Sequence, residues 1–336
     1  MRRMQITRRD LVALLAALPI STPTAGHAQQ RERIPRIGYF TSATGSPRDL
    51  LGVLETRALV EGLRELGWFD GRNISIEHRF SGTGPEHIRA SAKELAALSP
   101  DVIISVGGPQ LGALLAETRT IPIVFTMVND PVGAGYVASL AQPGGNATGF
   151  SVSEAPLAGK WLELLREIAP QVARALVLPQ ADAPSQQLWA QTVAAAAPAL
   201  GITVVTAPVR ELADYDREIE AFARQPGGGL VVLPNPIMAF NQERIHALAA
   251  LYRLPAVHSY PIYARTGGLV SYGPDPASLF HQAAGYIDKI LRGAKPGDLP
   301  VQQPTRILLV VNLKTARALS LTIPQSILDR ADEVIE

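Results

Sequence analysis

Short apolar runs alternate with amphipathic stretches along the chain from residue 34 onward. In the first part of the chain, the apolar runs are Arg36–Phe40, Asn73–Phe80, Asp101–Val106 and Ile121–Met127. Between them, Leu59, Leu63 and Leu66 recur at helical spacing, and residues 86–98 form a second amphipathic stretch. Apolar strands joined by helices are typical of a parallel sheet covered on both faces.

A second series of the same kind follows residue 150. Its first helix, Leu157–Ile168, gathers apolar side chains on one face. The further strands are Arg174–Leu178, Ile202–Thr206, Gly229–Leu233 and Pro255–His258, with helices near 184–199, 214–224 and 239–251. The pattern predicts an α/β protein of two doubly wound parallel-sheet lobes, joined by a hinge near residues 145–151.

The last part of the chain supplies further elements to both lobes. It contains a strand at Gly268–Tyr272, a helix at Pro276–Leu291 and a strand at Gln303–Asn312. We expect the first strand and the helix to return to the first lobe, and the last strand to join the second. The first lobe then comprises residues 34–149 and about 268–296, and the second comprises 150–267 and about 300–336.

The first residues have the pattern of an export signal, which we assign to residues 1–28. Four arginines precede the apolar run 11–18, and the small residues 25–28 follow it. Residues 7–11 (TRRDL) also resemble a twin-arginine signal, so the general secretory route and the twin-arginine route both stay open. The alternative is an amphipathic N-terminus on a cytoplasmic protein, which Pro19 and Pro23 disfavour.

The charge balance and the absence of cysteine limit the kinds of partner and chemistry that the protein can have. The chain has 31 Lys and Arg against 30 Asp and Glu; without residues 1–28, which hold four Arg and one Asp, the count is 27 against 29. This balance disfavours nucleic acid and anionic lipid as partners. Because the chain has no cysteine, thiolate catalysis, disulfides and a lipid anchor at the cleavage site are excluded. We expect a monomer in the periplasm.

No motif in the chain supports catalysis or a cofactor. The pair Gly107–Gly108 lacks the rest of a dinucleotide fingerprint, and the chain has neither a phosphate loop nor a GxSxG elbow. Glu77–His78 and Glu86–His87 lack metal-ligand spacing, and His246 and His258 stand alone. The sequence therefore predicts a protein that is not an enzyme and holds no cofactor or metal.

Small and polar residues follow many of the predicted strands. In an open parallel sheet, ligands gather at the carboxyl ends of the strands, where loops and helix N-termini present N–H groups. Each loop also has a structural interpretation: Asp130 and Asp275, for example, each precede a proline as a helix cap would. It is their shared position at one sheet edge that favours a ligand cleft.

The ordered motifs resemble a known family. PGGNATGFS, SYGPD and DLPVQQPT, with IGYFTSATGSP and DVIISVGGP before them, are similar to the substrate-binding proteins of ABC-type uptake transporters. The branch in question includes tryptophan- and tyrosine-binding members, and the resemblance covers nearly all of residues 34–336. It implies a type I periplasmic-binding-protein fold, a small-molecule ligand such as an amino acid or related carboxylate, and delivery to an ABC permease with a separate ATPase.

The resemblance also implies which loop positions contact the ligand. These candidates are Thr41, Ser42, Gly108, Pro109, Thr126, Asp130, Ser151, Asn235, Tyr272 and Asp275. N–H groups after Ser42 and Gly108 suit a carboxylate, and Asp130 or Asp275 suits an amine.

The mechanism we expect is closure of the two lobes about the hinge onto the ligand. Two other functions stay open: a ligand sensor that docks on a membrane receptor, and, with less support, an exported α/β hydrolase. A sugar-responsive repressor would need a DNA-binding headpiece where this chain has the signal.

Overall fold

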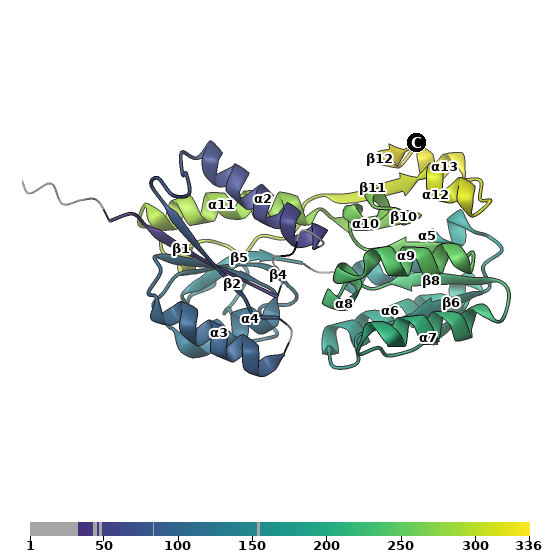
Figure 1. The fold of residues 1–336 in the computed structure, drawn as a ribbon, viewed down its shortest axis with the longest axis horizontal. Helices are drawn as coiled ribbons and strands as arrows, with labels where there is room; N and C mark the ends of the chain where they lie inside the picture. Colours follow the sequence, from purple (N-terminus) through teal and green to yellow (C-terminus); the bar gives the residue numbers. More distant parts are fainter. Residues whose placement is uncertain (1–32, 43–45, 47–48, 83, 153–154) are drawn as a thin grey trace, which may run out of the picture. The chain divides into compact units, whose positions relative to one another are not determined.

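The computed structural model describes residues 33–42, 46, 49–82, 84–152 and 155–336 (Figure 1). The predicted signal at residues 1–28 lies outside the described residues. Residues Pro35–Glu336 form one compact unit. This unit carries two separate sheets, and each is described below with the helices that cover it.

The first lobe is built on a five-stranded sheet of order β2-β1-β3-β4-β5. Its strands are β1 (Arg36–Thr41), β2 (Ser75–Phe80), β3 (Val102–Val106), β4 (Ile123–Val128) and β5 (Ala147–Ser151). Every neighbouring pair is parallel. Of the inner strands, β3 is buried along its whole length, and β1 and β4 are buried except at one residue each, which explains their largely apolar sequences.

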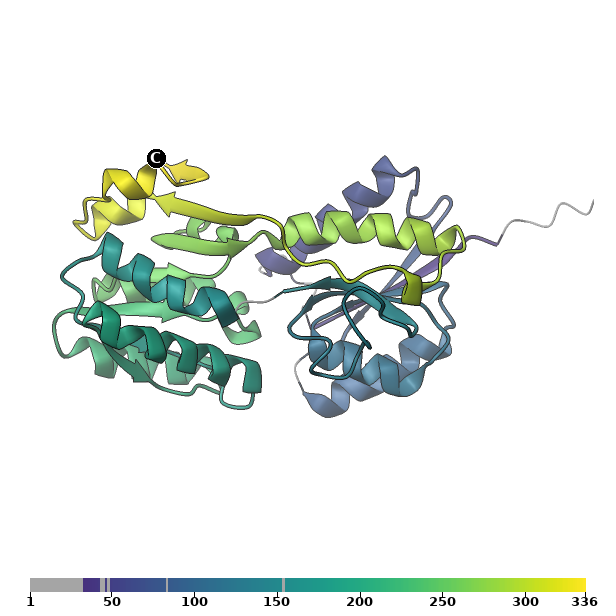
Figure 2. The same cartoon turned by 180° about the vertical axis from the view of Figure 1, so that it is seen from behind.

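Helices cover both faces of this sheet. Helices α3 (Pro85–Ala97) and α4 (Gly108–Glu117) pack on one face around Phe40 and Phe125. Helices α2 (Leu50–Glu65) and α11 (Pro276–Leu291) pack on the other face, around Tyr39 and Leu59. The helix that the sequence places after residue 275 therefore lies against the first lobe (Figure 2).

Helices α2 and α11 lie side by side because small residues let their backbones approach closely. A Cβ atom added to Gly62 would stand 2.8 Å from the carbonyl oxygen of His281. Beyond the end of α2, Trp68 Nε1 donates a hydrogen bond to Asp288 Oδ1 at 2.8 Å. Contacts between residues far apart in the sequence thus fix α11 to the first lobe.

The second lobe is built on a seven-stranded sheet of order β12-β11-β10-β9-β8-β6-β7. Its strands are β6 (Arg174–Val177), β7 (Thr203–Thr206), β8 (Gly228–Val232), β9 (Ala256–His258), β10 (Val270–Pro274), β11 (Ile307–Asn312) and β12 (Glu333–Ile335). Its helices are α5 (Ala155–Ile168), α6 (Pro184–Leu200), α7 (Leu212–Ala223), α8 (Pro236–Phe240), α9 (Gln242–Leu251), α10 (Pro261–Arg265), α12 (Leu313–Ala318) and α13 (Gln325–Leu328). Helices α5 and α6 cover one face, and α7 and α9 cover the other.

Strand β10 belongs to this second sheet, so the expectation that residues 268–272 return to the first lobe is wrong. It pairs in parallel with β9 and antiparallel with β11. Only the short helix α10 separates β9 from β10, and this connection keeps the two strands in one sheet. The antiparallel pair also departs from the wholly parallel sheets that the sequence pattern predicts.

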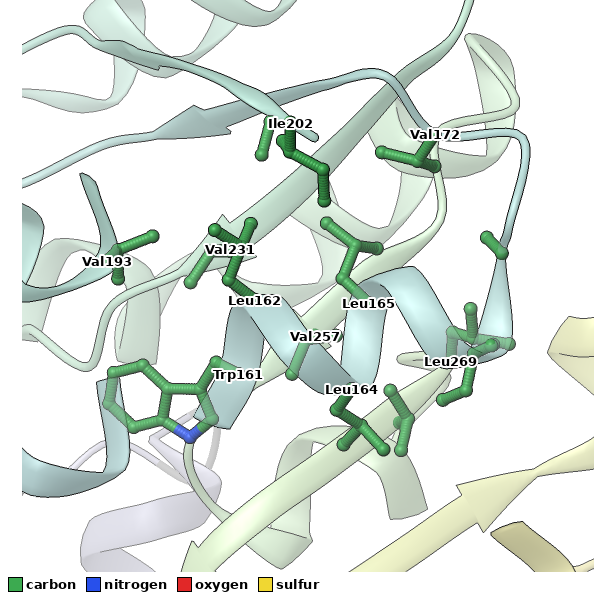
Figure 3. Close-up of a cluster of buried hydrophobic side chains, with 14 of the residues drawn as sticks. Trp161, Leu162, Leu164, Leu165, Val172, Val193, Ile202, Val231, Val257 and Leu269 are labelled. Atoms are coloured by element: carbon green, nitrogen blue, oxygen red, sulfur yellow. The ribbon is translucent and has the colours of Figure 1, made fainter. Parts of the chain in front are cut away.

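The core beneath α5 shows how one helix face anchors the second lobe. Trp161, Leu162 and Leu165 of α5 share one buried cluster with the strand residues Val231 and Val257 (Figure 3). The indole Nε1 of Trp161 donates to the carbonyl oxygen of Tyr272 on β10 at 2.7 Å, so the buried ring keeps its polar atom satisfied.

Along the chain, the described elements change from one lobe to the other after β5, after β10 and after the short 3-10 helix η1 (Pro296–Asp298). Two first-lobe side chains, Leu51 and Met127, also pack against the apolar cluster of the second lobe that contains Tyr260. The carboxyl edge of the first sheet therefore faces this cluster.

Candidate ligand site

Two threonines stand at the carboxyl edge of the first sheet, on the face covered by α2 and α11. Tyr39 and Val124 belong to the core on that face, so Thr41 and Thr126, two residues further along each strand, point the same way. Strands β1 and β4 are separated by β3. At the usual strand spacing, the two threonines are about 10 Å apart, a span that an amino acid can bridge.

The end of strand β4 is irregular, and this irregularity points to function. The register shifts between Thr126 and Val128, as in a β-bulge. Met127 has a φ of 57° and Asp130 a φ of 41°. Residues other than glycine rarely adopt a backbone conformation with such a positive φ. The hydroxyl of Thr126 is fully buried and, within the described part of the chain, has no hydrogen-bond partner. Strain and an unsatisfied polar group at one sheet edge are typical of a binding site.

The first turns of α2 bring two carboxyl groups to the same region. Asp49 caps the helix by accepting a hydrogen bond from Gly52 N at 3.1 Å. Glu55, two turns into the helix, is only 5% exposed. Burial, and then the charge of Asp49, raise the pKa of Glu55 well above its usual value.

Tyr39 lies beside these acids. Burial is the largest cause of its raised pKa, followed by the charge of Glu55. Its hydroxyl accepts a hydrogen bond from Thr56 Oγ1 at 3.3 Å. The phenol therefore stays neutral and polar next to a buried carboxyl group.

A cavity of about 540 Å³ opens on the outer side of α2, next to edge strand β2. Its wall includes Asp49, Thr56, His78 and Phe80. The ring of His78 stands 5.0 Å from that of Tyr39, and burial lowers the pKa of this histidine. The cavity lies beside the sheet edge and is lined by first-lobe residues.

The candidates on α4 present backbone groups. The helix begins at Gly108, after Gly107 with a φ of 94°, and no side chain caps it. Pro109 is exposed in the first turn, and Gln110 Nε2 donates to Ser81 Oγ at 3.1 Å. The N-terminus of α4 thus has N–H groups available to an anion.

The other first-lobe candidates differ in their exposure and in the hydrogen bonds that they already make. Ser42 follows Thr41 directly and is half-buried. Ser151, at the end of β5, donates its backbone N–H to Gln302 at 2.9 Å. Asp130 is exposed and accepts a hydrogen bond from Gly133 N at 2.9 Å, which closes a local turn.

The second-lobe candidates carry structural contacts. Asn235 caps α8 by accepting from Met238 N at 2.8 Å, and its amide nitrogen donates to Tyr215 Oη at 2.8 Å. Asp275 caps α11 by accepting from Ala277 N at 3.1 Å. The Tyr272 side chain packs against the α5 core. These contacts agree with the cap interpretation that the sequence left open for Asp275.

The sequence analysis did not identify Glu55, although its spacing from the apolar residues of the helix was visible in the sequence. Leu51, Glu55 and Leu59 recur every four residues, so the glutamate lies on the apolar face of the helix. A carboxylate on a buried face needs a partner, and this is the signal that could have identified it.

Two α/β lobes with polar groups at the carboxyl ends of their strands define a ligand-binding protein of the periplasmic type. The family model for ABC transporter substrate binding proteins matches residues 53–335, and the chain belongs to that family. The resemblance seen in the sequence and the predicted fold class are both confirmed. The family consists of solute-binding proteins that work with a transporter, and not of enzymes.

Relatives of known structure support the assignment. The chain is 29% identical to a conserved domain protein of Vibrio cholerae, with a TM-score of 0.80 over 90% of this chain and 100% of that one. It is 26% identical to an ABC domain from Streptococcus pneumonia in complex with L-Trp, with a TM-score of 0.78 over 90% of this chain and 99% of that one.

A curated relative, the tyrosine-binding protein of Clostridioides difficile (strain R20291), is 24% identical over 271 residues, which are 79% of this chain and 76% of the relative. No helix in the described part of the chain has the length and apolar character needed to cross a membrane.

Proposed function

We propose that the protein captures a free amino acid outside the cytoplasmic membrane and delivers it to an ABC permease that is driven by a separate ATPase. The observation that carries this proposal is that one lobe holds both a buried carboxyl group, Glu55, and a helix N-terminus at Gly108 without a side-chain cap. An amino acid carries one charge of each sign, and these two groups suit its two ends.

The relatives favour an aromatic side chain on the ligand. One solved relative holds L-Trp, and a curated relative is named for tyrosine binding. Apolar and aromatic side chains near the edge, including Met127, Leu51 and Tyr260, suit such a ring. Thr41, Ser42, Pro109, Thr126 and Ser151 complete the proposed first-lobe wall, and Asn235 and Tyr272 belong to the second lobe.

Capture proceeds by closure of the lobes over the ligand, and the closed form docks on the permease. The three connecting passages between the sheets support this mechanism, because such connections let two lobes rotate as rigid bodies. The strained residues Met127 and Asp130 lie where closure would act.

We propose export through the signal at residues 1–28 and a monomeric mature protein in the periplasm. N-terminal sequencing of the protein from a periplasmic fraction tests this. The expected mature end is near Gln29. Retention of residues 1–28 in a cytoplasmic protein would contradict it.

Calorimetry with residues 29–336 tests the ligand class. The panel contains the common L-amino acids, their amine-free acid analogues and simple sugars. We expect one ligand per chain and a higher unfolding temperature with the amino acids that bind. A folded protein that binds none of the amino acids would overturn the proposal.

A further inference from the structure

Glu55 is a buried acidic side chain for which the protein supplies no positive partner. It is 5% exposed, and among the described residues neither a hydrogen bond nor an ion pair engages its carboxyl group. Arg57, one of the two exposed arginines of the same helix, pairs instead with Glu61, at 2.8 Å. A buried carboxylate without a partner is costly, so its presence calls for a cation.

The position of Glu55 places it at the ligand edge. It shares its helix face with Leu59, in the first-lobe core, and with Leu51, which packs against the second-lobe cluster. Glu55 therefore lies between the core and the facing lobe. Its charge acts on Tyr39, which stands on β1 two residues before the strand ends at Thr41.

A second, independent observation comes from the sheet itself. Thr126 is fully buried on the same face of the sheet, and its hydroxyl has no partner in the described part of the chain. A hydroxyl can accept a hydrogen bond from an ammonium or donate one to a carboxylate. An unpaired carboxyl group on α2 and an unsatisfied hydroxyl on the sheet face that α2 covers point to a polar ligand at this edge.

We propose that Glu55 binds the ammonium group of the ligand, with the Thr126 hydroxyl as a neighbouring contact, and that this pair restricts the site to ligands with a primary amine. The inference rests on the proposed function and specifies its chemistry. Asp130 and Asp275, the acids that the sequence suggests for this role, each cap their own turn or helix. Glu55 has no such local contact.

Calorimetry with Glu55→Gln tests the proposal, because the amide keeps the size of the side chain and removes its charge. The control is Glu65→Gln, an exposed position at the end of the same helix. The ligands are L-tyrosine, L-tryptophan and 3-(4-hydroxyphenyl)propionate, which lacks the amine. We expect Glu55→Gln to weaken amino-acid binding by at least about 30-fold, and Glu65→Gln to leave it unchanged.

The amine-free acid helps to distinguish a failure of the proposed role of Glu55 from a failure of the proposed function. We expect it to bind the wild type more weakly than L-tyrosine, and Glu55→Gln to leave its affinity unchanged. If the wild type binds amino acids and Glu55→Gln binds them equally well, the role of Glu55 is wrong and the proposed function stands. If the wild type binds no amino acid, both are wrong.

A measurement on the wild type keeps the test valid if Glu55→Gln does not fold. Because the pKa of Glu55 is raised in the free protein, an incoming ammonium will displace its proton. In a series of measurements from pH 8 to pH 4, calorimetry in buffers of different ionisation enthalpy should report proton release on amino-acid binding. Binding without proton release would overturn the proposal.

Discussion

Lowering the pH should destabilise the second lobe through two buried histidines. His246 and His258 stand with ring centroids 5.0 Å apart, in a pocket of about 220 Å³ beside Gly267 and Gly268. Their four ring nitrogens are buried, and none makes a hydrogen bond of good geometry with the described residues. Burial lowers the pKa of His246 to about 4, against a weak opposing effect of the Thr266 backbone.

Proton linkage determines the direction in which the unfolding free energy changes with pH. In the unfolded chain, a histidine has a pKa of about 6.5, so the unfolded state binds more protons than the folded state below that pH. The stabilising contribution is complete above pH 6.5 and falls as the pH drops toward 4. For His246 alone, a change from pH 8 to pH 5 should cost about 2 kcal/mol of unfolding free energy. His258, whose pKa is lowered by burial and by His246, adds to this loss.

Urea unfolding between pH 8 and pH 5 measures the effect. Glu55 acts in the opposite direction, because its raised pKa makes the folded state bind the extra proton. The informative quantity is therefore the difference between the wild type and His246→Gln, and His87→Gln, at an exposed histidine, is the control. We expect a weaker acid sensitivity in His246→Gln alone. Equal pH dependence in all three proteins would show that His246 does not contribute to the acid sensitivity.

Three further predictions concern packing and the site. Gly62→Ala should lower the unfolding free energy by about 1–3 kcal/mol, because its Cβ would meet the backbone of α11; Gly285→Ala, with open space around it, should be neutral or stabilising, as thermal unfolding will show. Trp161→Phe should cost about 1–3 kcal/mol in urea unfolding, since it leaves the Tyr272 carbonyl without its donor; an unchanged midpoint would contradict this. Thr126→Val should leave stability equal or higher and weaken amino-acid binding in calorimetry, because the hydroxyl has no partner inside the protein; lower stability with full affinity would show a structural role.

The alternation of apolar runs and amphipathic stretches predicted the elements well. Strands β3 and β4, for example, lie where largely apolar runs predict them, because a strand buried on both faces has no regular polar alternation. The assignment of a strand to one sheet or the other was harder. Residues 270–274 would suit either sheet by sequence, and only the pairing with β9 and β11 decides.

The candidate site was predicted in part. Loops after the strands were identified by their small and polar residues, and Thr126 was one of the ten candidates. Asn235 and Asp275 have the same residue types as ligand contacts, but both cap helices, and local sequence does not separate these roles. Glu55 lies inside a helix, so the residue types of the loops do not indicate it. Its importance follows from its burial, which depends on tertiary packing.

In the proposed complex, this edge of the first lobe holds an amino acid by its ammonium group. A crystal structure of the protein purified from its native host, with the ligand it carries, tests this most directly. We predict an amino acid with its ammonium nitrogen within hydrogen-bond distance of the Glu55 carboxylate and close to Thr126. A carried ligand without an amine, or one bound away from Glu55, would contradict the claim.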